Sequence, residues 1–277
     1  MSEYERERDV ALSAAREAGA VVMESYAQLN EGDIGEKGKN DMVTVVDHRS
    51  QAIVVQALRK AFPDDFIVAE EDLAESVNAG LDPEGERRWY IDPLDGTTNY
   101  IHAYPMFAAS IALEAAGEMV MGVTFDPMRD ELFHAVRGGG AYLNNEPIGV
   151  SAVSSKVRTL LATGFPFRAR HYLDDYLKTF RFFFNNSRGI RRGGSAALDL
   201  AYVAIGRVDA FWEMTLSPWD MAAGVILIEE AGGRVTDFFG EKNSLDNGHI
   251  VATNGAFHDW MCENIQSVFP KGTDLIV

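Results

Sequence analysis

The chain has 277 residues, of which 47% are hydrophobic and 24% charged, and this composition is typical of a folded globular protein. The formal net charge of −17 argues against general nucleic-acid binding and against association with anionic membranes, because like charges repel. The single cysteine, Cys262, excludes an intrachain disulfide, and without an export signal or an apolar stretch long enough to span a bilayer we expect a cytoplasmic protein.

Two amphipathic helices are predicted near the start of the chain. Apolar residues at three- and four-residue spacings predict a helix over residues 10–29, which Gly32 and Gly35 would end. The same spacing predicts a second helix over residues 49–62, and Pro63 stops it.

Short apolar runs separated by turn residues predict strands. Residues 66–69 form a strand that ends at Glu70 and Glu71, and residues 89–91 form another that ends at Asp92. An antiparallel meander follows, because glycines, Asp-Pro and Asn-Asn separate four further runs. These runs are residues 107–113, 120–125, 132–136 and 141–143.

The second half begins after a soft boundary near residues 151–155. Ser195 is typical of the N-cap of a helix through Ala204, and Ser217 with Pro218 opens another helix that runs to Glu230. Strands are predicted at residues 208–212, 235–236 and 250–252, and a C-terminal helix from about Ala256. These patterns indicate a mixed α and β protein.

The most informative segment is WYIDPLDGTTN, from Trp89 to Asn99. A buried strand brings Asp92 to its exposed end, and Asp95 follows in a turn that Gly96 permits, so that two carboxylates can converge. Converging carboxylates repel unless they are protonated or bridged by a cation, and oxygen ligands favour Mg²⁺, Mn²⁺ or Ca²⁺ over zinc. An EF-hand is excluded, because Ala103 stands at its twelfth position. Each Asp-Pro or Asp-Gly pair alone is also an ordinary turn.

Several such segments together resemble the inositol monophosphatase family of Mg²⁺-dependent, lithium-sensitive phosphatases. The two signatures of that family resemble residues 92–99 and residues 219–224, the second followed by residues 230–233. Further similar pieces are residues 43–47, 69–71 and 194–197, while residues 162–167 and 191–200 are most similar to the bacterial branch. Ala69 departs from the glycine common in the family and leaves the neighbouring acid intact.

The resemblance implies a layered fold, an αβαβα sandwich of the sugar-phosphatase type. Residues 1–152 would form an N-terminal α+β half with an antiparallel sheet, and residues 153–277 a C-terminal α/β half, packed as a single compact unit with the site between them. The resemblance also implies a homodimer.

The resemblance implies two or three Mg²⁺ ions, with Mn²⁺ as a substitute and Li⁺ as an inhibitor. One ion would be bound by Glu70, Asp92 and the carbonyl of Leu94, and a second by Asp92, Asp95 and Asp220. Glu70, Thr97 and Asp47 would form the catalytic group, in which Thr97 holds the attacking water and Asp47 accepts its proton. On the residue pattern alone, Glu70 is equally typical of a solvated strand end, and Asp220 of a helix N-terminal turn.

The resemblance further implies a polyol pocket, in which the Glu213 carboxylate accepts hydrogen bonds from ring hydroxyls. The implied substrate-binding residues are Asp95, Gly96, Thr97, Gly194, Ser195, Ala196, Glu213 and Asp220.

The predicted activity is Mg²⁺-dependent hydrolysis of myo-inositol 1-phosphate to inositol and phosphate. Thr98 and Asn99 favour this substrate, because relatives that act on nucleotide 3′-phosphates or histidinol phosphate tend to carry Lys or Arg at the position of Thr98. The alternatives are a phosphatase of fructose 1,6-bisphosphate, histidinol phosphate or 3′-phosphoadenosine 5′-phosphate, and a regulatory partner of the transcription or ribosomal RNA machinery. The cluster of Arg188, Arg191 and Arg192 would serve as the edge of the substrate mouth, a dimer contact, a docking patch or a solvated turn.

Overall fold

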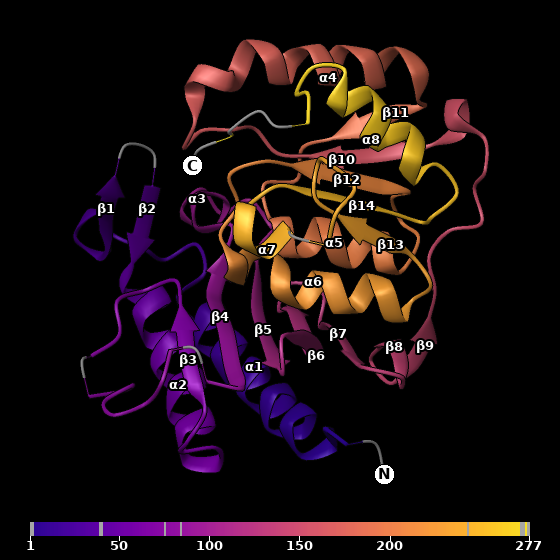
Figure 1. The fold of residues 1–277 in the computed structure, drawn as a ribbon. Helices are drawn as coiled ribbons and strands as arrows, with labels where there is room; N and C mark the ends of the chain where they lie inside the picture. Colours follow the sequence, from indigo (N-terminus) through magenta and orange to yellow (C-terminus); the bar gives the residue numbers. More distant parts are fainter. Residues whose placement is uncertain are drawn as a thin grey trace.

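Two β-sheets and three layers of helices alternate through the molecule (Figure 1). The structure is a computed structural model that describes residues 3–38, 41–74, 76–83, 85–242, 244–271 and 275. Helices α1 (Glu5–Ser25) and α2 (Val45–Ala61) cover one face of a seven-stranded sheet, and α5 (Ala196–Ala204) and α6 (Pro218–Glu230) lie between the two sheets. Helices α4 (Leu173–Asn186) and α8 (His258–Gln266) cover the outer face of a five-stranded sheet. The predicted αβαβα order is confirmed.

The seven-stranded sheet contains the predicted meander in the spatial order β3-β4-β5-β6-β7-β8-β9. Strands β3 and β4 are parallel, and every later pair of neighbours is antiparallel. Asn144 and Asn145 both adopt positive φ, 47° and 71°, which is the geometry of a tight hairpin turn. The strands are β3 (Phe66–Ala69), β4 (Arg87–Asp95), β5 (Ala108–Ala115), β6 (Glu118–Asp126), β7 (Glu131–Val136), β8 (Gly140–Leu143) and β9 (Glu146–Ile148).

The five-stranded sheet is mixed, with the order β11-β10-β12-β14-β13. Strand β10 runs parallel to β11 and to β12, so β10 and β12 end at the same edge, whereas β14 runs antiparallel to both of its neighbours. The strands are β10 (Leu160–Thr163), β11 (Gly189–Arg191), β12 (Ala210–Glu213), β13 (Arg234–Thr236) and β14 (Ile250–Thr253).

Short elements complete the described chain. Strands β1 (Ile34–Gly38) and β2 (Asp41–Thr44) form a separate antiparallel hairpin. The remaining helical turns are η1 (Glu31–Asp33), α3 (Thr97–Ile101), η2 (Lys156–Arg158), η3 (Arg170–Tyr172) and α7 (Ser244–Asn247).

Each interface between layers is filled by apolar side chains. Phe133, Leu200, Phe211 and Ile226 are fully buried where α5 and α6 pack between the two sheets. A second core lies beneath α1 and α2 around Trp89, and a third beneath α4 and α8. Burying one such side chain stabilises a fold by about 1.5–3 kcal/mol, so these cores hold the strand ends and helix starts that meet between the halves.

The first two helices begin earlier than predicted. Helix α1 starts at Glu5, because acidic residues of its first turn interact favourably with the helix dipole, and it ends at Ser25 instead of at residue 29. The next residue, Tyr26, is extended, so the predicted stops at Gly32 and Gly35 were wrong. Helix α2 starts at Val45 instead of residue 49, because Thr44 opens a capping box.

Other predicted bounds also shift, and some elements were not predicted. Strand β4 extends the predicted run 89–91 in both directions, and α8 begins at His258 instead of Ala256. Helix α4 and the hairpin β1–β2 were not predicted at all. Among the described residues, no helix is long and apolar enough to cross a membrane.

Candidate active site

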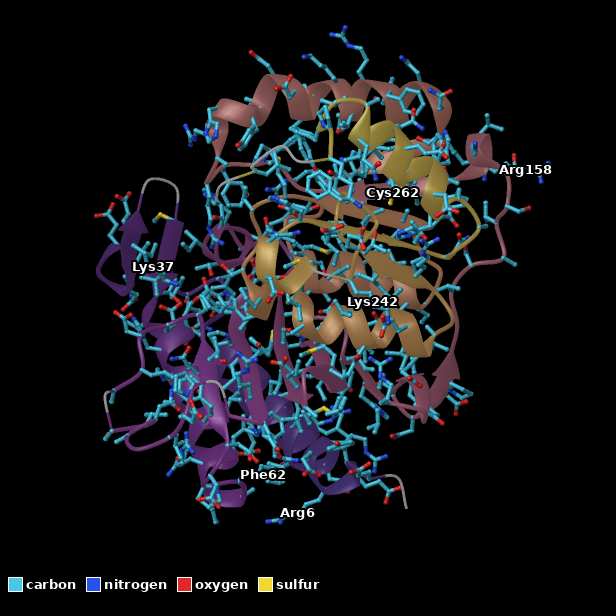
Figure 2. The ribbon with its side chains drawn as sticks, in the orientation of Figure 1. Arg6, Lys37, Phe62, Arg158, Lys242 and Cys262 are labelled. Carbon is cyan, nitrogen blue, oxygen red and sulfur yellow. The ribbon has the colours of Figure 1, made fainter. Side chains whose placement is uncertain are left out.

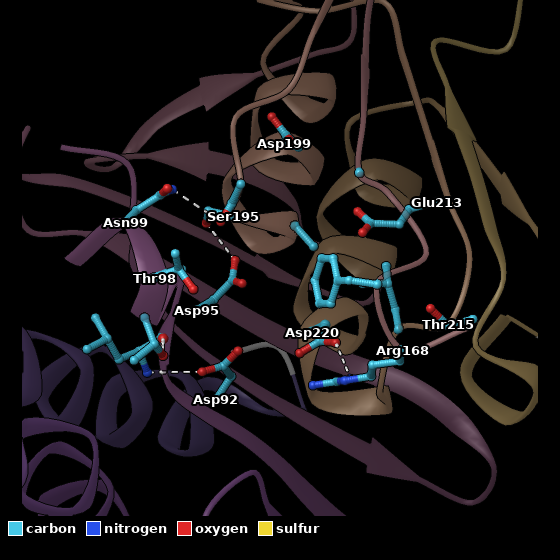
Figure 3. A pocket seen from close by; sticks show the side chains of 18 of the residues that line it. Asp92, Asp95, Thr98, Asn99, Arg168, Ser195, Asp199, Glu213, Thr215 and Asp220 are labelled. Carbon is cyan, nitrogen blue, oxygen red and sulfur yellow. Dashed lines mark hydrogen bonds and ion pairs between the residues drawn. The ribbon is translucent and has the colours of Figure 1, made fainter. Parts of the chain in front are cut away.

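A pocket with a volume of about 310 Å³ collects residues from both halves of the chain (Figure 3). It is lined by the end of β4, the start of α3, the loop after β10, and the N-terminal turns of α5 and α6. The predicted site residues that line it are Glu70, Asp92, Leu94, Asp95, Gly96, Thr97, Gly194, Ser195, Ala196, Glu213 and Asp220. Asp47 does not line the pocket.

The end of β4 places the first acids through an irregular strand. The pairing of β4 with β5 shifts register between Asp92 and Asp95, and Asp92 Oδ1 accepts a hydrogen bond of 3.0 Å from the Leu94 N–H. Gly96 follows with φ of 94°, and a Cβ added there would lie 2.9 Å from the Met106 carbonyl oxygen. Only glycine therefore fits this turn without displacing the backbone.

Asp47 lies behind the pocket and reaches it through Thr97. Its Oδ2 accepts hydrogen bonds from the Thr44 N–H at 2.9 Å and from the Thr44 hydroxyl at 2.5 Å. The Thr97 hydroxyl lies 3.0 Å from Asp47 Oδ1 and 3.1 Å from the Leu94 carbonyl oxygen, both of which are acceptors. Burial, and next the charge of Glu70, raise the pKa of Asp47, while hydrogen bonds from Thr44 and Thr97 oppose the change.

The C-terminal half holds two of the acids by donors at helix starts. Asp95 Oδ2 accepts from the Ser195 hydroxyl at 2.5 Å and from the Ala197 N–H at 2.8 Å, at the first turn of α5. Asp220 is the third residue of α6, and its Oδ2 accepts from the Ser217 N–H at 2.8 Å. Asp95 and Asp220 are thus oriented by a serine hydroxyl and by backbone N–H groups at the starts of α5 and α6.

The acids of the pocket are buried and repel one another. Burial, followed by the charges of Glu70, Asp95 and Asp220, raises the pKa of Asp92 well above its ordinary value. Burial also raises the pKa of Asp95 to about 6 and, together with the charge of Asp95, the pKa of Asp220 to about 8. A divalent cation would stabilise the ionised forms of such a set, and its ligands are all oxygen, so the residues fit Mg²⁺ or Mn²⁺.

Basic side chains lie at both edges of the acid group. Lys37, on the β1–β2 hairpin at the left of Figure 2, donates to Glu70 and Glu71. Burial works against the charge of Lys37, but the two glutamates outweigh it and raise the pKa of Lys37 to about 12. Arg168 Nη1 lies 3.9 Å from Asp220 Oδ2. With these partners in place, no three His, Cys, Asp or Glu side chains of the described residues are already arranged to hold an ion.

Glu213 forms another wall of the pocket, at the end of β12. Its side chain is 6% exposed, and within the described part of the chain no hydrogen bond or ion pair is found for its carboxylate. A Cβ added to Gly164 would lie 1.8 Å from Glu213 Oε1, so that glycine leaves the space that the carboxylate occupies. Burial raises the pKa of Glu213 well above its ordinary value, and the nearby Arg192 opposes this.

The edge of the substrate mouth was one alternative predicted for the arginine cluster, whereas Arg168 and Asp199 were not predicted with a role in the site. Of the three clustered arginines only Arg192 lines the pocket, while Arg191 Nη1 donates to the Ile190 carbonyl beside it. Arg168 and Asp199 also line the pocket. Nothing in their local sequence marks them, because their neighbours in the pocket are distant in the chain.

The chain is similar to proteins of known family. A family model described as "Inositol monophosphatase family" matches residues 3–269. Nus factor SuhB of Pseudomonas aeruginosa is 47% identical over 265 residues, which cover 95% of this chain and 96% of the relative. Inositol-1-monophosphatase of Mesorhizobium japonicum is 41% identical over 247 residues, which cover 89% of this chain and 91% of the relative. The structure of inositol monophosphatase from Anabaena matches with a TM-score of 0.85 and 42% identity, covering 98% of this chain and 99% of that one.

Proposed function

We propose that this chain, which belongs to the inositol monophosphatase family, is a Mg²⁺-dependent phosphomonoesterase that hydrolyses inositol monophosphate to inositol and phosphate. One observation carries the proposal. Carboxylates from both halves line a single pocket together with Leu94, and the Thr97–Asp47 hydrogen bond adjoins them. This arrangement suits phosphoryl transfer to water, which needs positioning and charge stabilisation more than covalent chemistry.

The metal ligands are assigned on the same basis. Glu70, Asp92 and the Leu94 carbonyl would hold one Mg²⁺. Asp92, Asp95 and Asp220 would hold a second, and a third ion would bind with no ligand assigned to it. Bound Mg²⁺ supplies a lowered pKa for a water nucleophile and charge neutralisation on the phosphate and leaving oxygens.

Thr97 and Asp47 act on the proton of that water. When the Thr97 hydroxyl donates to Asp47 Oδ1, its oxygen lone pairs are free to accept from water. The water proton then moves to Thr97 Oγ1 as the hydroxyl proton moves to Asp47 Oδ1. The pKa of Asp47 is raised chiefly by its burial, and this favours retention of the proton on Asp47. Glu70 belongs to the catalytic group as a ligand of the first Mg²⁺.

The alcohol part of the substrate would lie against Glu213. This carboxylate accepts hydrogen bonds from hydroxyls, while Gly194, Ser195 and Ala196 contact the ring. The N–H groups of Gly96 and Thr97 would donate to the phosphate oxygens.

The proposal is tested by kcat/KM with Mg²⁺ for inositol 1-phosphate, fructose 1,6-bisphosphate, histidinol phosphate and adenosine 3′,5′-bisphosphate. We expect inositol 1-phosphate to be preferred, Mn²⁺ to replace Mg²⁺ in part, and Li⁺ to inhibit. Asp95→Asn and Asp220→Asn should abolish turnover, and undiminished turnover in both variants would refute the proposal.

A second role is favoured by the 47% identity to a Nus factor. In this role the protein is a partner of the transcription machinery, and Arg191 on the exposed edge of β11 belongs to the contact. Cells that carry Asp95→Asn should then grow like cells with the unaltered protein. Cells that carry Arg191→Ala should grow like cells that lack it. If Asp95→Asn cells behave like cells without the protein, this role is excluded.

We also propose a homodimer, because α4 carries an uncovered apolar stripe. Leu173, Leu177 and Phe184 lie on one face of the helix and are 39%, 40% and 61% exposed. Light scattering after size-exclusion chromatography should show a dimer that Phe184→Glu converts to a monomer. Lys178→Glu changes the charge of the same helix off the stripe and should leave the dimer intact.

A further inference from the structure

Asp199 is a buried acid that the proposed mechanism does not use. It lies in the first turn of α5, is 3% exposed and lines the pocket. Within the described residues its carboxylate has no hydrogen-bond or ion-pair partner. No oxygen of Asp199 is among the fully enclosed side-chain atoms of the described residues that lack a partner, so the carboxylate opens onto the pocket, where a ligand that donates a hydrogen bond can reach it.

The backbone around Asp199 leaves room for its carboxylate. A Cβ added to Gly193 would lie 2.8 Å from Asp199 Oδ1 and 3.3 Å from Oδ2. Gly164 leaves room for Glu213 in the same way. Besides the acids of the proposed metal site, the pocket therefore contains the buried carboxyl groups of Asp199 on α5 and Glu213 on β12 (Figure 3). Each of the two lies where a glycine leaves space for it.

The charges nearby do not satisfy these acceptors. Arg192 lines the pocket, but its guanidinium lies over the ring of Phe167, 6.0 Å from the ring centre, and forms no ion pair with either carboxylate among the described contacts. Burial raises the pKa of Asp199 well above its ordinary value, the charge of Asp95 adds to this, and Arg192 opposes it. A second phosphate group placed here would meet two acceptor carboxyls, whereas hydroxyl groups would donate to them.

We propose that Asp199 is a specificity-determining residue that accepts a hydrogen bond from a hydroxyl of the substrate's alcohol part, so that with Glu213 it selects monophosphates of polyhydroxylated alcohols. This inference rests on the proposed phosphatase function and narrows its substrate class. It assigns Asp199 to recognition of the alcohol and leaves the hydrolysis to the acids of the metal site.

The test compares three phosphate esters hydrolysed by the Mg²⁺-loaded protein. Inositol 1-phosphate offers ring hydroxyls, p-nitrophenyl phosphate offers none, and O-phosphoethanolamine offers an ammonium group instead. The measured quantity is the ratio of kcat/KM for inositol 1-phosphate to that for p-nitrophenyl phosphate. We expect Asp199→Ala to lower this ratio about ten- to a hundredfold, the discrimination that one lost hydrogen bond to a carboxylate gives, and Asp199→Asn to lower it less.

A second variant moves the carboxylate without removing it. Gly193→Ala places a Cβ 2.8 Å from Asp199 Oδ1 and 2.7 Å from the flexible end of Met106, and it should lower the same ratio. Gly189→Ala is the matched control on β11, because its Cβ would make only ordinary contacts, 3.6 Å or longer, and the ratio should stay unchanged. Thermal unfolding of each variant shows whether it is folded.

The outcomes separate the inference from the proposed function. A ratio unchanged in folded Asp199→Ala and Gly193→Ala overturns the role of Asp199, as does an equal loss for all esters. A loss confined to O-phosphoethanolamine also overturns it, because the ligand group would then be a cation. If the unaltered protein hydrolyses none of the esters with Mg²⁺, the proposed function itself fails.

Discussion

Binding of Mg²⁺ should release protons, because the proposed ligand Asp220 must lose its proton to bind the ion. Burial and the charge of Asp95 raise the pKa of this carboxyl to about 8. At pH 7 a group with this pKa holds about 0.9 proton, and Asp95, with a pKa of about 6, holds about 0.1. We therefore expect about one proton or more to be released per chain at pH 7 when Mg²⁺ binds.

The dependence of affinity on pH follows from the same numbers. Each proton released raises the binding constant about tenfold per pH unit, so Mg²⁺ should bind nearly tenfold more tightly at pH 7.5 than at pH 6.5. The stability of the metal-free protein depends on pH in the opposite direction. Because the folded pKa of Asp220 is raised, its stabilising contribution is present below the unfolded pKa and is lost as the pH rises towards about 8. The rise in Tm on adding Mg²⁺ should thus be larger at pH 8 than at pH 6.

Isothermal titration calorimetry in two buffers of different ionisation enthalpy counts the protons. Asp220→Asn should release about 0.9 proton fewer at pH 7 where it still binds Mg²⁺. Asp126→Asn is the control, because Asp126 is also a buried carboxylate but lies outside the pocket and pairs with Arg129. Proton release near zero, with an affinity that does not change between pH 6 and pH 8, would refute the reasoning.

Three further outcomes are expected. Thr97→Val, which keeps the shape and removes the hydroxyl, should lower kcat about a hundredfold with little change in Mg²⁺ affinity by calorimetry, and an unchanged kcat contradicts the proton route. Burial lowers the pKa of His258 to about 4, so the unfolded state binds the proton first as the pH falls below 6.5. Urea unfolding should show that this group lowers the free energy of unfolding by up to about 3 kcal/mol between pH 6.5 and pH 4. His258→Gln should remove that part of the pH dependence. A Cβ at Gly122 would lie 2.8 Å from the Ala223 carbonyl oxygen, so Gly122→Ala should destabilise by about 1–3 kcal/mol in urea while Gly189→Ala changes stability little.

Local signals predicted those elements whose ends depend on a few neighbouring residues. Ser217 and Pro218 determine where α6 starts through backbone geometry within one turn, and Asn144 with Asn145 determines a hairpin in the same way. Helix α4 was missed although its sequence is amphipathic, and its start carries no capping side chain of the kind that marks α2 and α5. Its place on the outer sheet depends on tertiary packing.

Some site residues could likewise be predicted from their neighbours in the sequence, whereas others come to the site only through tertiary packing. The segment around Asp92 carries its own geometry, so the spacing of its acids was informative before the fold was known. The contact of Lys37 with Glu70 joins residues 33 positions apart, and neither residue carries a local sign of the other. Asp199 falls in a helical pattern in which an acid near the start is ordinary, and only the pocket shows that its carboxylate is buried without a partner.

The fold explains how so many acids can be buried around one pocket. Asp47 and Asp220 are each the third residue of a helix and close a capping box, in α2 and α6, and Asp95 accepts from the N–H of Ala197 at the start of α5. Three helix N-termini therefore direct their positive ends at the acids, and each such contact contributes about 0.3–1 kcal/mol, more where it is partly buried. These dipoles, with Lys37 and Arg168, offset only part of the repulsion, since the pKa values of Asp92, Asp95 and Asp220 stay raised. The remaining charge is what a divalent cation would neutralise, so part of the net charge of −17 has a specific place in the protein, at the pocket where we propose that the metal ions bind.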